Sequence, residues 1–215
     1  MRGRVLCGSL SWVPAAGSDG SSSSKARRSL ALTAQTRCSA NLSDFGPRVR
    51  VVEADPLDSA TLVALVRNQD AVVFALGLDT SGPTTFLSDT TRILVAAMQQ
   101  AGVRRLVAIT GVGAGQTLGH GGWWYDWIVY PLFTRHRYAD KNRQEELIEG
   151  SGLDWTIVRP APFAEKRADG PLQVHTSVRS DTTLRRVTRV EVADFVLDQL
   201  TSNRYVHEKP FIGHP

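Results

Sequence analysis

From residue 49 onward the sequence predicts an α/β fold, a doubly wound parallel β-sheet with helices on both faces. Three observations support this prediction. Short apolar runs alternate with stretches of helical apolar spacing, the connections between them are short, and a chain of 215 residues suits one ordinary domain of this class. Ligands of such sheets bind beyond the carboxyl ends of the strands, so the residues that follow each strand are candidates for a functional site.

Strands and helices alternate in chain order. The expected strands are short β-branched or fully apolar runs at residues 49–54, 71–76, 106–110 and 155–158. The expected helices carry apolar residues three and four apart at residues 58–66, 83–101, 138–149 and 190–200. We expect Asp58 to cap the first helix and Gly102 to end the second. The strand ends then present Asp55, Gly77, Thr110 to Gly115 and Arg159-Pro160 at the edge where ligands bind.

The charge of the chain is distributed unevenly. The formal net charge is +4, but residues 1–42 hold six basic residues against one acid, which leaves 19 basic and 20 acidic residues for 43–215. A nearly neutral body argues against a nucleic-acid-binding surface. The spacing of Cys7 and Cys38 argues against a metal site or disulfide framework, and no apolar run reaches the ~18 residues of a membrane span. We therefore expect a cytoplasmic protein with no nucleic-acid, membrane or metal partner.

Several segments in order resemble one known family. They are residues 51–57, 70–77, 83–85, 95–98, 102–103 and 151–160, the last reading Ser-Gly-Leu-Asp-Trp-Thr-Ile-Val-Arg-Pro. Between residues 42 and 214 the chain thus resembles the atypical short-chain dehydrogenase/reductase group of NAD(P)H-binding proteins. Biliverdin reductase B and the NmrA-like proteins are its nearest familiar relatives. The resemblance implies a Rossmann-type sheet, a nicotinamide cofactor and a role for each candidate residue.

At the adenine end, the resemblance implies that Asp55 and Leu57 contact the adenine ring. It also implies that Gly77 lets the backbone approach the cofactor ribose, where a side chain would obstruct it. The local sequence offers an alternative role for Asp55 and for Gly77. Asp55 precedes Pro56 and is also a typical turn residue, and Gly77 is also typical turn punctuation.

At the nicotinamide end, the resemblance implies that Thr110 places a hydroxyl near the ring, that Lys141 bonds the ribose, and that Pro160 lies beside the carboxamide. The alternative for Lys141 is a solvated helix lysine that pairs with Glu145 one turn later.

The pattern departs from the wider family in its catalytic residues. Many members use Ser, Tyr and Lys, with Tyr and Lys four apart, so that the lysine lowers the phenol pKa from its usual value of about 10. Here Tyr138 and Lys141 are three apart, which still shares one helix face, and Gly111 stands where biliverdin reductase B has a serine. Proton donation by Tyr138 and hydride transfer with solvent as proton source are both open.

Residues 1–42 lack the family's Gly-x-x-Gly-x-x-Gly loop, which holds the pyrophosphate at a helix N-terminus, and read as a low-complexity Ser/Arg-rich segment. Codon arithmetic suggests a reason. In the frame shifted back by one base, the codons of Trp12 and Val13 force a glycine, and the following codons permit Gly-Ala-Ser-Gly-x-x-Gly. We therefore interpret 1–42 as an aberrant first βα unit, out of frame over about residues 7–30, before an NAD(P)-binding domain at 43–215.

A targeting leader is the alternative for this segment, because nine serines and six basic residues accompany one acid. The frame recovers near Leu32, in a stretch that resembles the family's second strand and closes at Arg37. The resemblance implies that Arg37 binds the 2′-phosphate of NADP, which favours NADP over NAD. The alternative is a surface arginine in a leader.

The function predicted from these patterns is an NAD(P)H-dependent oxidoreductase, a monomer or homodimer, that acts on a small conjugated or carbonyl substrate. The residues assigned to catalysis are Thr110, Tyr138 and Lys141. Two alternatives stay open: a non-catalytic NAD(P)-binding sensor of the NmrA-like kind, and a product that has lost cofactor binding.

Overall fold

The computed structural model of the protein describes residues 9–11, 29–34, 49–77, 83–111, 135–177, 182 and 184–215. Residues 9–11, 29–34, 49–51, 53 and 135–138 are described by their backbone alone. The helices are α1 (Ser59–Val66), α2 (Phe86–Ala101), α3 (Arg135–Glu149) and α4 (Arg189–Thr201). The strands are β1 (Ser9–Ser11), β2 (Ser29–Ala34), β3 (Val49–Ala54), β4 (Ala71–Phe74), β5 (Arg105–Ile109), β6 (Asp154–Pro160), β7 (Gln173–His175) and β8 (Phe211–Gly213).

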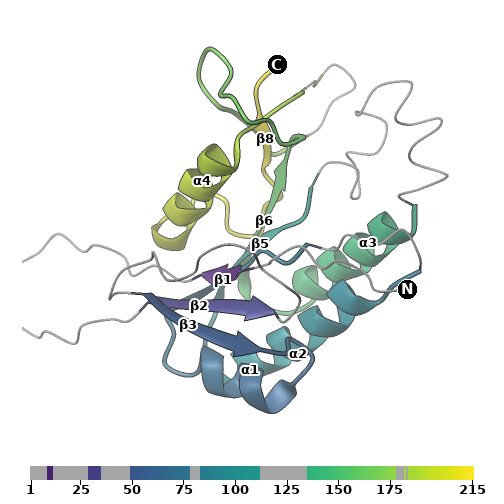
Figure 1. The fold of residues 1–215 in the computed structure, drawn as a ribbon, viewed down its shortest axis with the longest axis vertical. Coiled ribbons are helices and arrows are strands. Elements are labelled where there is room, and N and C mark those ends of the chain that lie inside the picture. The colour runs from purple at the N-terminus through teal and green to yellow at the C-terminus, as the bar shows by residue number, and fades with distance from the viewer. Residues whose placement is uncertain are drawn as a thin grey trace, which may run out of the picture.

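The strands form two hydrogen-bonded sheets, ordered β1-β2-β3 and β4-β5-β6-β8-β7 (Figure 1). Strand β2 runs parallel to β3, and β4, β5, β6 and β8 run parallel to one another. This confirms the predicted α/β fold with a mostly parallel sheet. The sequence did not predict the two antiparallel pairings, which join β7 to β8 and β1 to β2.

Strand β1 lies where the two sheets meet. It pairs with β2 over Ser9–Ser11 and also lies against β4, with which it forms no ladder. In doubly wound sheets this place belongs to the first parallel strand, which joins the two halves of the sheet. Here a three-residue antiparallel strand stands in that place, and the ladder is interrupted between β1 and β4.

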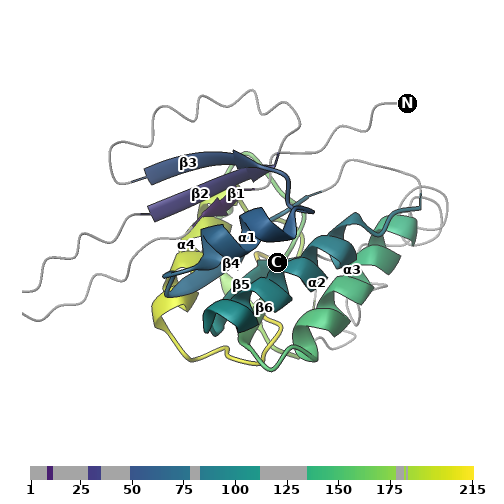
Figure 2. The same ribbon diagram turned by 90° about the horizontal axis from the view of Figure 1, so that it is seen from below.

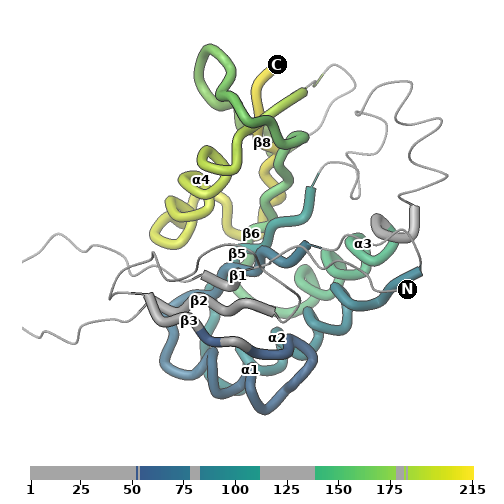
Figure 3. Tube along the Cα trace, in the orientation of Figure 1, coloured from purple at the N-terminus to yellow at the C-terminus, as the bar shows by residue number. Residues whose placement is uncertain are grey.

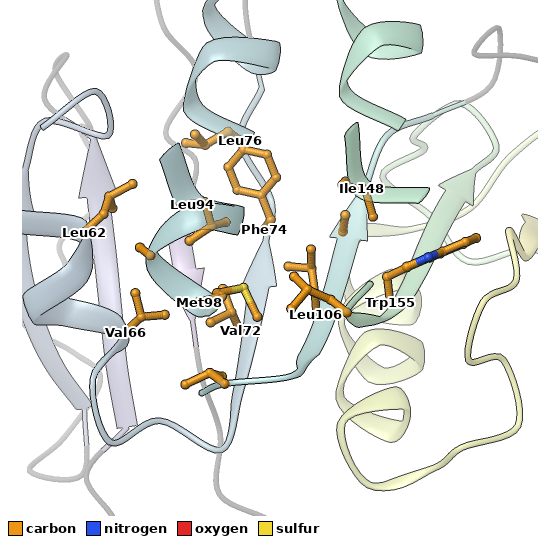
Figure 4. Close-up of a cluster of buried hydrophobic side chains, with 14 of the residues drawn as sticks. Leu62, Val66, Val72, Phe74, Leu76, Leu94, Met98, Leu106, Ile148 and Trp155 are labelled. Atoms are coloured by element: carbon orange, nitrogen blue, oxygen red, sulfur yellow. The ribbon is translucent and has the colours of Figure 1, made fainter. Parts of the chain in front are cut away.

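Helices cover both faces of β4, β5 and β6. Alternate strand residues point to opposite faces, so Val72, Phe74 and Leu106 join a core with α1, α2 and α3 (Figure 4). Val73 and Val107 join a second core with α4. Figures 1 and 2 show α4 on the other side of β5 and β6 from α2 and α3.

The start of α1 and the end of α2 are formed by the capping residues that the sequence predicted. The Asp58 carboxylate accepts hydrogen bonds from the backbone N–H groups of Ala60 and Thr61 and caps α1. Gly102, with φ of 70°, ends α2 in the left-handed conformation that favours glycine. Helix α3 begins at Arg135, three residues before the predicted start.

The C-terminal strands were not predicted. Strands β7 and β8 are three residues each, too short for a period-2 pattern, and they add to the sheet beyond β6. The chain trace in Figure 3 shows β8 beyond β6. Across the described part of the chain, no helix combines the length and apolar character needed to cross a membrane.

Candidate functional site

The candidate site lies at the carboxyl ends of the parallel strands. Thr110 follows β5 directly, Pro160 closes the neighbouring strand β6, and Gly77 follows β4 on the other side of β5. The backbone N–H of Thr110 donates to the carbonyl of Val158 across the β5–β6 ladder, at 3.0 Å. These three predicted site residues therefore share one edge of the sheet, as the strand order requires.

Thr110 is held by a buried side chain of α3. Its hydroxyl donates to Glu145 Oε1 over 2.8 Å. Both residues are nearly inaccessible, with 5% of Thr110 and 3% of Glu145 exposed. A buried carboxylate therefore fixes the side chain of the residue that the sequence placed nearest the nicotinamide.

Lys141 reaches the same strand end from one turn earlier in α3. Its Nζ donates to the backbone carbonyl of Thr110 at 2.5 Å, and the side chain is half-buried. The lysine therefore lies at the site, in contrast to the solvated surface lysine of the alternative interpretation. Its predicted pairing partner Glu145 is buried and bonded to Thr110.

Gly111 has a backbone reason to be glycine. Its φ is +142°, a conformation that L side chains rarely adopt, and a Cβ built there would stand 3.4 Å from Lys141 Nζ. The departure from the serine of biliverdin reductase B thus coincides with a backbone that brings Lys141 close to the chain.

Arg159 is a third charged residue of the cluster; the sequence placed it at a strand end but assigned it no role. Arg159 Nε donates to Glu145 Oε1 at 3.2 Å and Arg159 Nη2 to Glu145 Oε2 at 2.5 Å, and 3% of each side chain is exposed. Lys209 Nζ stands 3.7 Å from the same Oε2 and also pairs with Glu149. A charged residue inside the otherwise buried strand β6 was the signal, because a buried charge requires a partner.

Asp140 links α3 to the N-terminus of α2. Its fully buried carboxylate accepts from the backbone N–H groups of Leu87 and Ser88 at 2.9 and 3.2 Å, and from the Ser88 hydroxyl. It therefore caps the N-terminus of α2 from the neighbouring helix α3. This contact fixes α3, and with it Lys141 and Glu145, against the rest of the domain.

At the end of β3, Asp55 forms a local turn. Its Oδ1 accepts from the N–H of Leu57 at 2.9 Å, and its carbonyl accepts from the N–H of Asp58 at 3.0 Å. Asp55 therefore forms the turn that the local sequence indicated. The same turn leaves Leu57 44% exposed at the sheet edge, so the adenine contact of both residues stays a prediction.

Two predicted site residues are not placed by the structure. Arg37 lies outside the described residues. Tyr138 belongs to α3 three residues before Lys141, but only its backbone is described.

The residues at this edge fit a nicotinamide dinucleotide in their chemistry. A lysine ammonium and a threonine hydroxyl stand together at the end of β5, a carboxylate follows β3, and glycines at positions 77 and 111 put no side chain in the way of a ligand. These groups suit ribose hydroxyls, a carboxamide and an adenine ring. The segment that stands in place of the family's pyrophosphate-binding loop lies largely outside the described part of the chain.

Comparison with known proteins decides the family. The model of a family described as NAD(P)H-binding matches residues 17–203, most of the chain. This protein belongs to the NAD(P)H-binding family. The family membership confirms the resemblance that the sequence motifs indicated.

A curated relative shares part of this sequence. The protein is 29% identical over 173 residues to Protein TIC 62, chloroplastic, of Oryza sativa subsp. japonica. The match covers 75% of this chain and 30% of that protein. The chain thus spans less than a third of the length of this relative.

Solved structures show the same Rossmann fold. A short-chain dehydrogenase/reductase from Veillonella parvula, solved in complex with NADP, matches 80% of this chain and 75% of its own with a TM-score of 0.64 and 15% identity. ChuY, an anaerobillin reductase from Escherichia coli O157:H7, matches 78% and 76% with a TM-score of 0.60 and 18% identity. Their likeness confirms the fold class predicted from the sequence.

Proposed function

We propose that this protein is an NADP-dependent oxidoreductase of the atypical short-chain dehydrogenase/reductase type, acting on a small conjugated or carbonyl substrate. The observation that carries the proposal is the grouping of Lys141, Thr110 and Gly111 at the end of β5. There the ammonium group, the hydroxyl and the open backbone meet at the edge where ligands of such sheets bind. When bound, the nicotinamide supplies a hydride.

The chain's own residues bind and orient in this proposal. Lys141, half-buried against the Thr110 carbonyl, donates to a ribose hydroxyl. Pro160 borders the carboxamide, and Gly77 leaves room for the sugar. At the far end, the turn at Asp55 holds its carboxylate and Leu57 at the edge of β3, where they receive the adenine ring.

The preference for NADP depends on Arg37. An arginine at the end of the second strand pairs with a 2′-phosphate, whereas an acidic residue there binds the free ribose hydroxyl of NAD. Strand β2 ends at Ala34, three residues before Arg37. An Arg37→Glu variant is expected to bind NADPH at least tenfold more weakly and NADH no more weakly, measured by fluorescence titration.

The aberrant N-terminal segment is part of the proposal. Support comes from β1, which runs antiparallel to β2 at the place of the central parallel strand. We assign residues 1–42 to an aberrant first βα unit that is read out of frame over about residues 7–30, ahead of the domain at 43–215. Sequencing the start of the gene tests this: a shifted frame that encodes the glycine-rich loop supports it, and a stop codon in that frame contradicts it.

A non-catalytic NAD(P)-binding sensor is the second candidate. Gly111 favours it, because a glycine there supplies no hydroxyl beside Thr110, where biliverdin reductase B has a serine. The two functions differ in turnover. Under the first, NADPH is oxidised with at least one member of a flavin and quinone panel; under the second, NADPH binds and none is oxidised.

Tyr138 is tested in the same assay. Tyr138→Phe removes the phenol and lowers kcat at least tenfold if the tyrosine donates the proton. Tyr205→Phe is the matched control, because Tyr205 packs on Phe195 in the second core, away from α3. Full activity in Tyr138→Phe removes the tyrosine from the mechanism and leaves solvent as the proton source.

A further inference from the structure

The Thr110 hydroxyl has only one hydrogen, and the buried cluster beneath it determines where that hydrogen points. Both oxygens of Glu145 accept hydrogens from Arg159, in the paired geometry of a guanidinium and an ionised carboxylate. An ionised carboxylate has no hydrogen to donate. The 2.8 Å contact between Thr110 Oγ1 and Glu145 Oε1 is therefore donated by the threonine.

The orientation is enforced by burial. Glu145 and Arg159 are each 3% exposed, so neither partner exchanges the contact for water at low cost. Lys209, 3.7 Å from Glu145 Oε2, adds a second cation to the same carboxylate. The cluster thus holds an acceptor under the Thr110 hydroxyl.

We propose that Glu145, held by Arg159, is a positioning residue that turns the hydrogen of the Thr110 hydroxyl into the protein and presents its oxygen to the ligand as a hydrogen-bond acceptor. Thr110 then binds an N–H or O–H group of the ligand, such as a carboxamide or a ribose hydroxyl. It does not donate a hydrogen to a carbonyl oxygen of the substrate. This inference rests on the proposed function for the identity of the ligand, but the direction of the hydroxyl does not.

Lys141 supplies a donor at the strand end that carries Thr110. Its Nζ donates to the Thr110 carbonyl, which brings an ammonium donor to the residue whose hydroxyl oxygen accepts. The end of β5 therefore offers a donor in Lys141 and an acceptor in Thr110. A ribose hydroxyl, which donates and accepts, matches both groups.

The first test needs no cofactor. In the full chain with labelled threonine, the Thr110 hydroxyl proton is expected to exchange slowly with water and to appear in the NMR spectrum, because it is buried and bonded to a carboxylate. Thr110→Val identifies the signal by its loss. The double variant Glu145→Leu with Arg159→Met removes the acceptor and its counter-charge together, which leaves no unpaired buried charge. A Thr110 hydroxyl signal that is absent from the wild-type protein, or unchanged in the double variant, overturns the proposal.

The second test is a double-mutant cycle on the dissociation constant of NADPH, with thermal unfolding as a check on folding. Thr110→Val is expected to weaken NADPH binding about fivefold in the wild-type background, the loss of one neutral hydrogen bond. In the Glu145→Leu/Arg159→Met background the same change is expected to have an effect below twofold. Thr110→Ser restores wild-type affinity in the first background, because it keeps the hydroxyl.

The outcomes separate this proposal from the proposed function. Equal effects of Thr110→Val in both backgrounds show that Glu145 does not act through Thr110 and overturn the positioning role. Absence of NADPH binding by the wild-type chain overturns the proposed function and the ligand assigned to Thr110. The NMR signal still decides the direction of the hydroxyl in that case.

Discussion

Two glutamates, Glu145 and Glu191, are buried carboxylates that need partners, and the two sets of partners have different roles. Glu145 lies under the carboxyl ends of β5 and β6, and its partners are Arg159 and the Thr110 hydroxyl. Glu191 lies in the first turn of α4 and is bonded to Thr188, His214 and Arg167. Both are almost inaccessible, at 3% and 7% exposure.

The difference between the two lies in what their partners do. Glu191 and Thr188 form a reciprocal capping box, and His214 ties the helix to the last strand region, so the partners of Glu191 are structural. The partners of Glu145 include a residue of the candidate site. A buried carboxylate is therefore no sign of function by itself; the group that it holds decides its role.

The largest expected effect comes from Arg159. Arg159→Met leaves Glu145 as a buried charge without its main partner, which is expected to destabilise the fold by about 3–5 kcal/mol in urea unfolding. The matched control is Arg167→Met on the Glu191 side. Arg167 is 69% exposed, so its loss is expected to cost less than about 1 kcal/mol. Equal costs for the two arginines would contradict the contrast between the clusters.

The next effect concerns Glu191 and is pH-dependent. Burial by itself raises the pKa of Glu191, but hydrogen bonds from Thr188 and His214 outweigh it and lower the pKa from 4.5 to about 2. A depressed folded pKa stabilises the fold above the unfolded pKa, and this stabilisation is lost as the pH falls through the folded pKa.

Glu191→Gln is therefore expected to lower the free energy of unfolding by about 1.5–3 kcal/mol at neutral pH. The difference from wild type is expected to shrink as the pH falls from 4.5 towards 2, measured by urea unfolding at each pH. The dissociation constant of NADPH is expected to stay within about twofold of wild type. A larger change in NADPH binding would place Glu191 in the site and remove the contrast with Glu145.

The smallest effect comes from the cap itself. Thr188→Ala removes the hydroxyl that accepts from the Glu191 N–H and is expected to cost about 1 kcal/mol. Thr201→Ala is the control, because Thr201 is exposed and its hydroxyl donates to the carbonyl of Asp198 over a long 3.4 Å. A cost for Thr201→Ala as large as that for Thr188→Ala would show that the cap adds nothing to α4.

The contrast also marks what the sequence could and could not predict. Elements governed by local rules were predicted: Asp58 caps α1, Gly102 ends α2, and the apolar runs form β4, β5 and β6. The position of Thr110 and Pro160 at one sheet edge followed from the same rules, since parallel strands end together.

Contacts between distant residues were not predictable from local rules. Glu145 and Arg159 are 14 positions apart on different elements, and Asp140 caps a helix that begins 54 positions earlier. The sequence contains these residues without any spacing that pairs them. The antiparallel direction of β1 was not predictable either, because a three-residue strand carries no signal of its direction.

The central claim is that the end of β5 binds a nicotinamide cofactor through Lys141, and a fluorescence titration with NADPH tests it most directly. Lys141→Met is compared with Lys166→Met, which removes an exposed lysine beyond β6. We expect saturable binding by the wild-type chain and at least about tenfold weaker binding by Lys141→Met, as for a lost charge-assisted hydrogen bond. We expect no change beyond twofold in Lys166→Met. Absence of NADPH binding by the folded wild-type chain, or equal losses in the two variants, would contradict it.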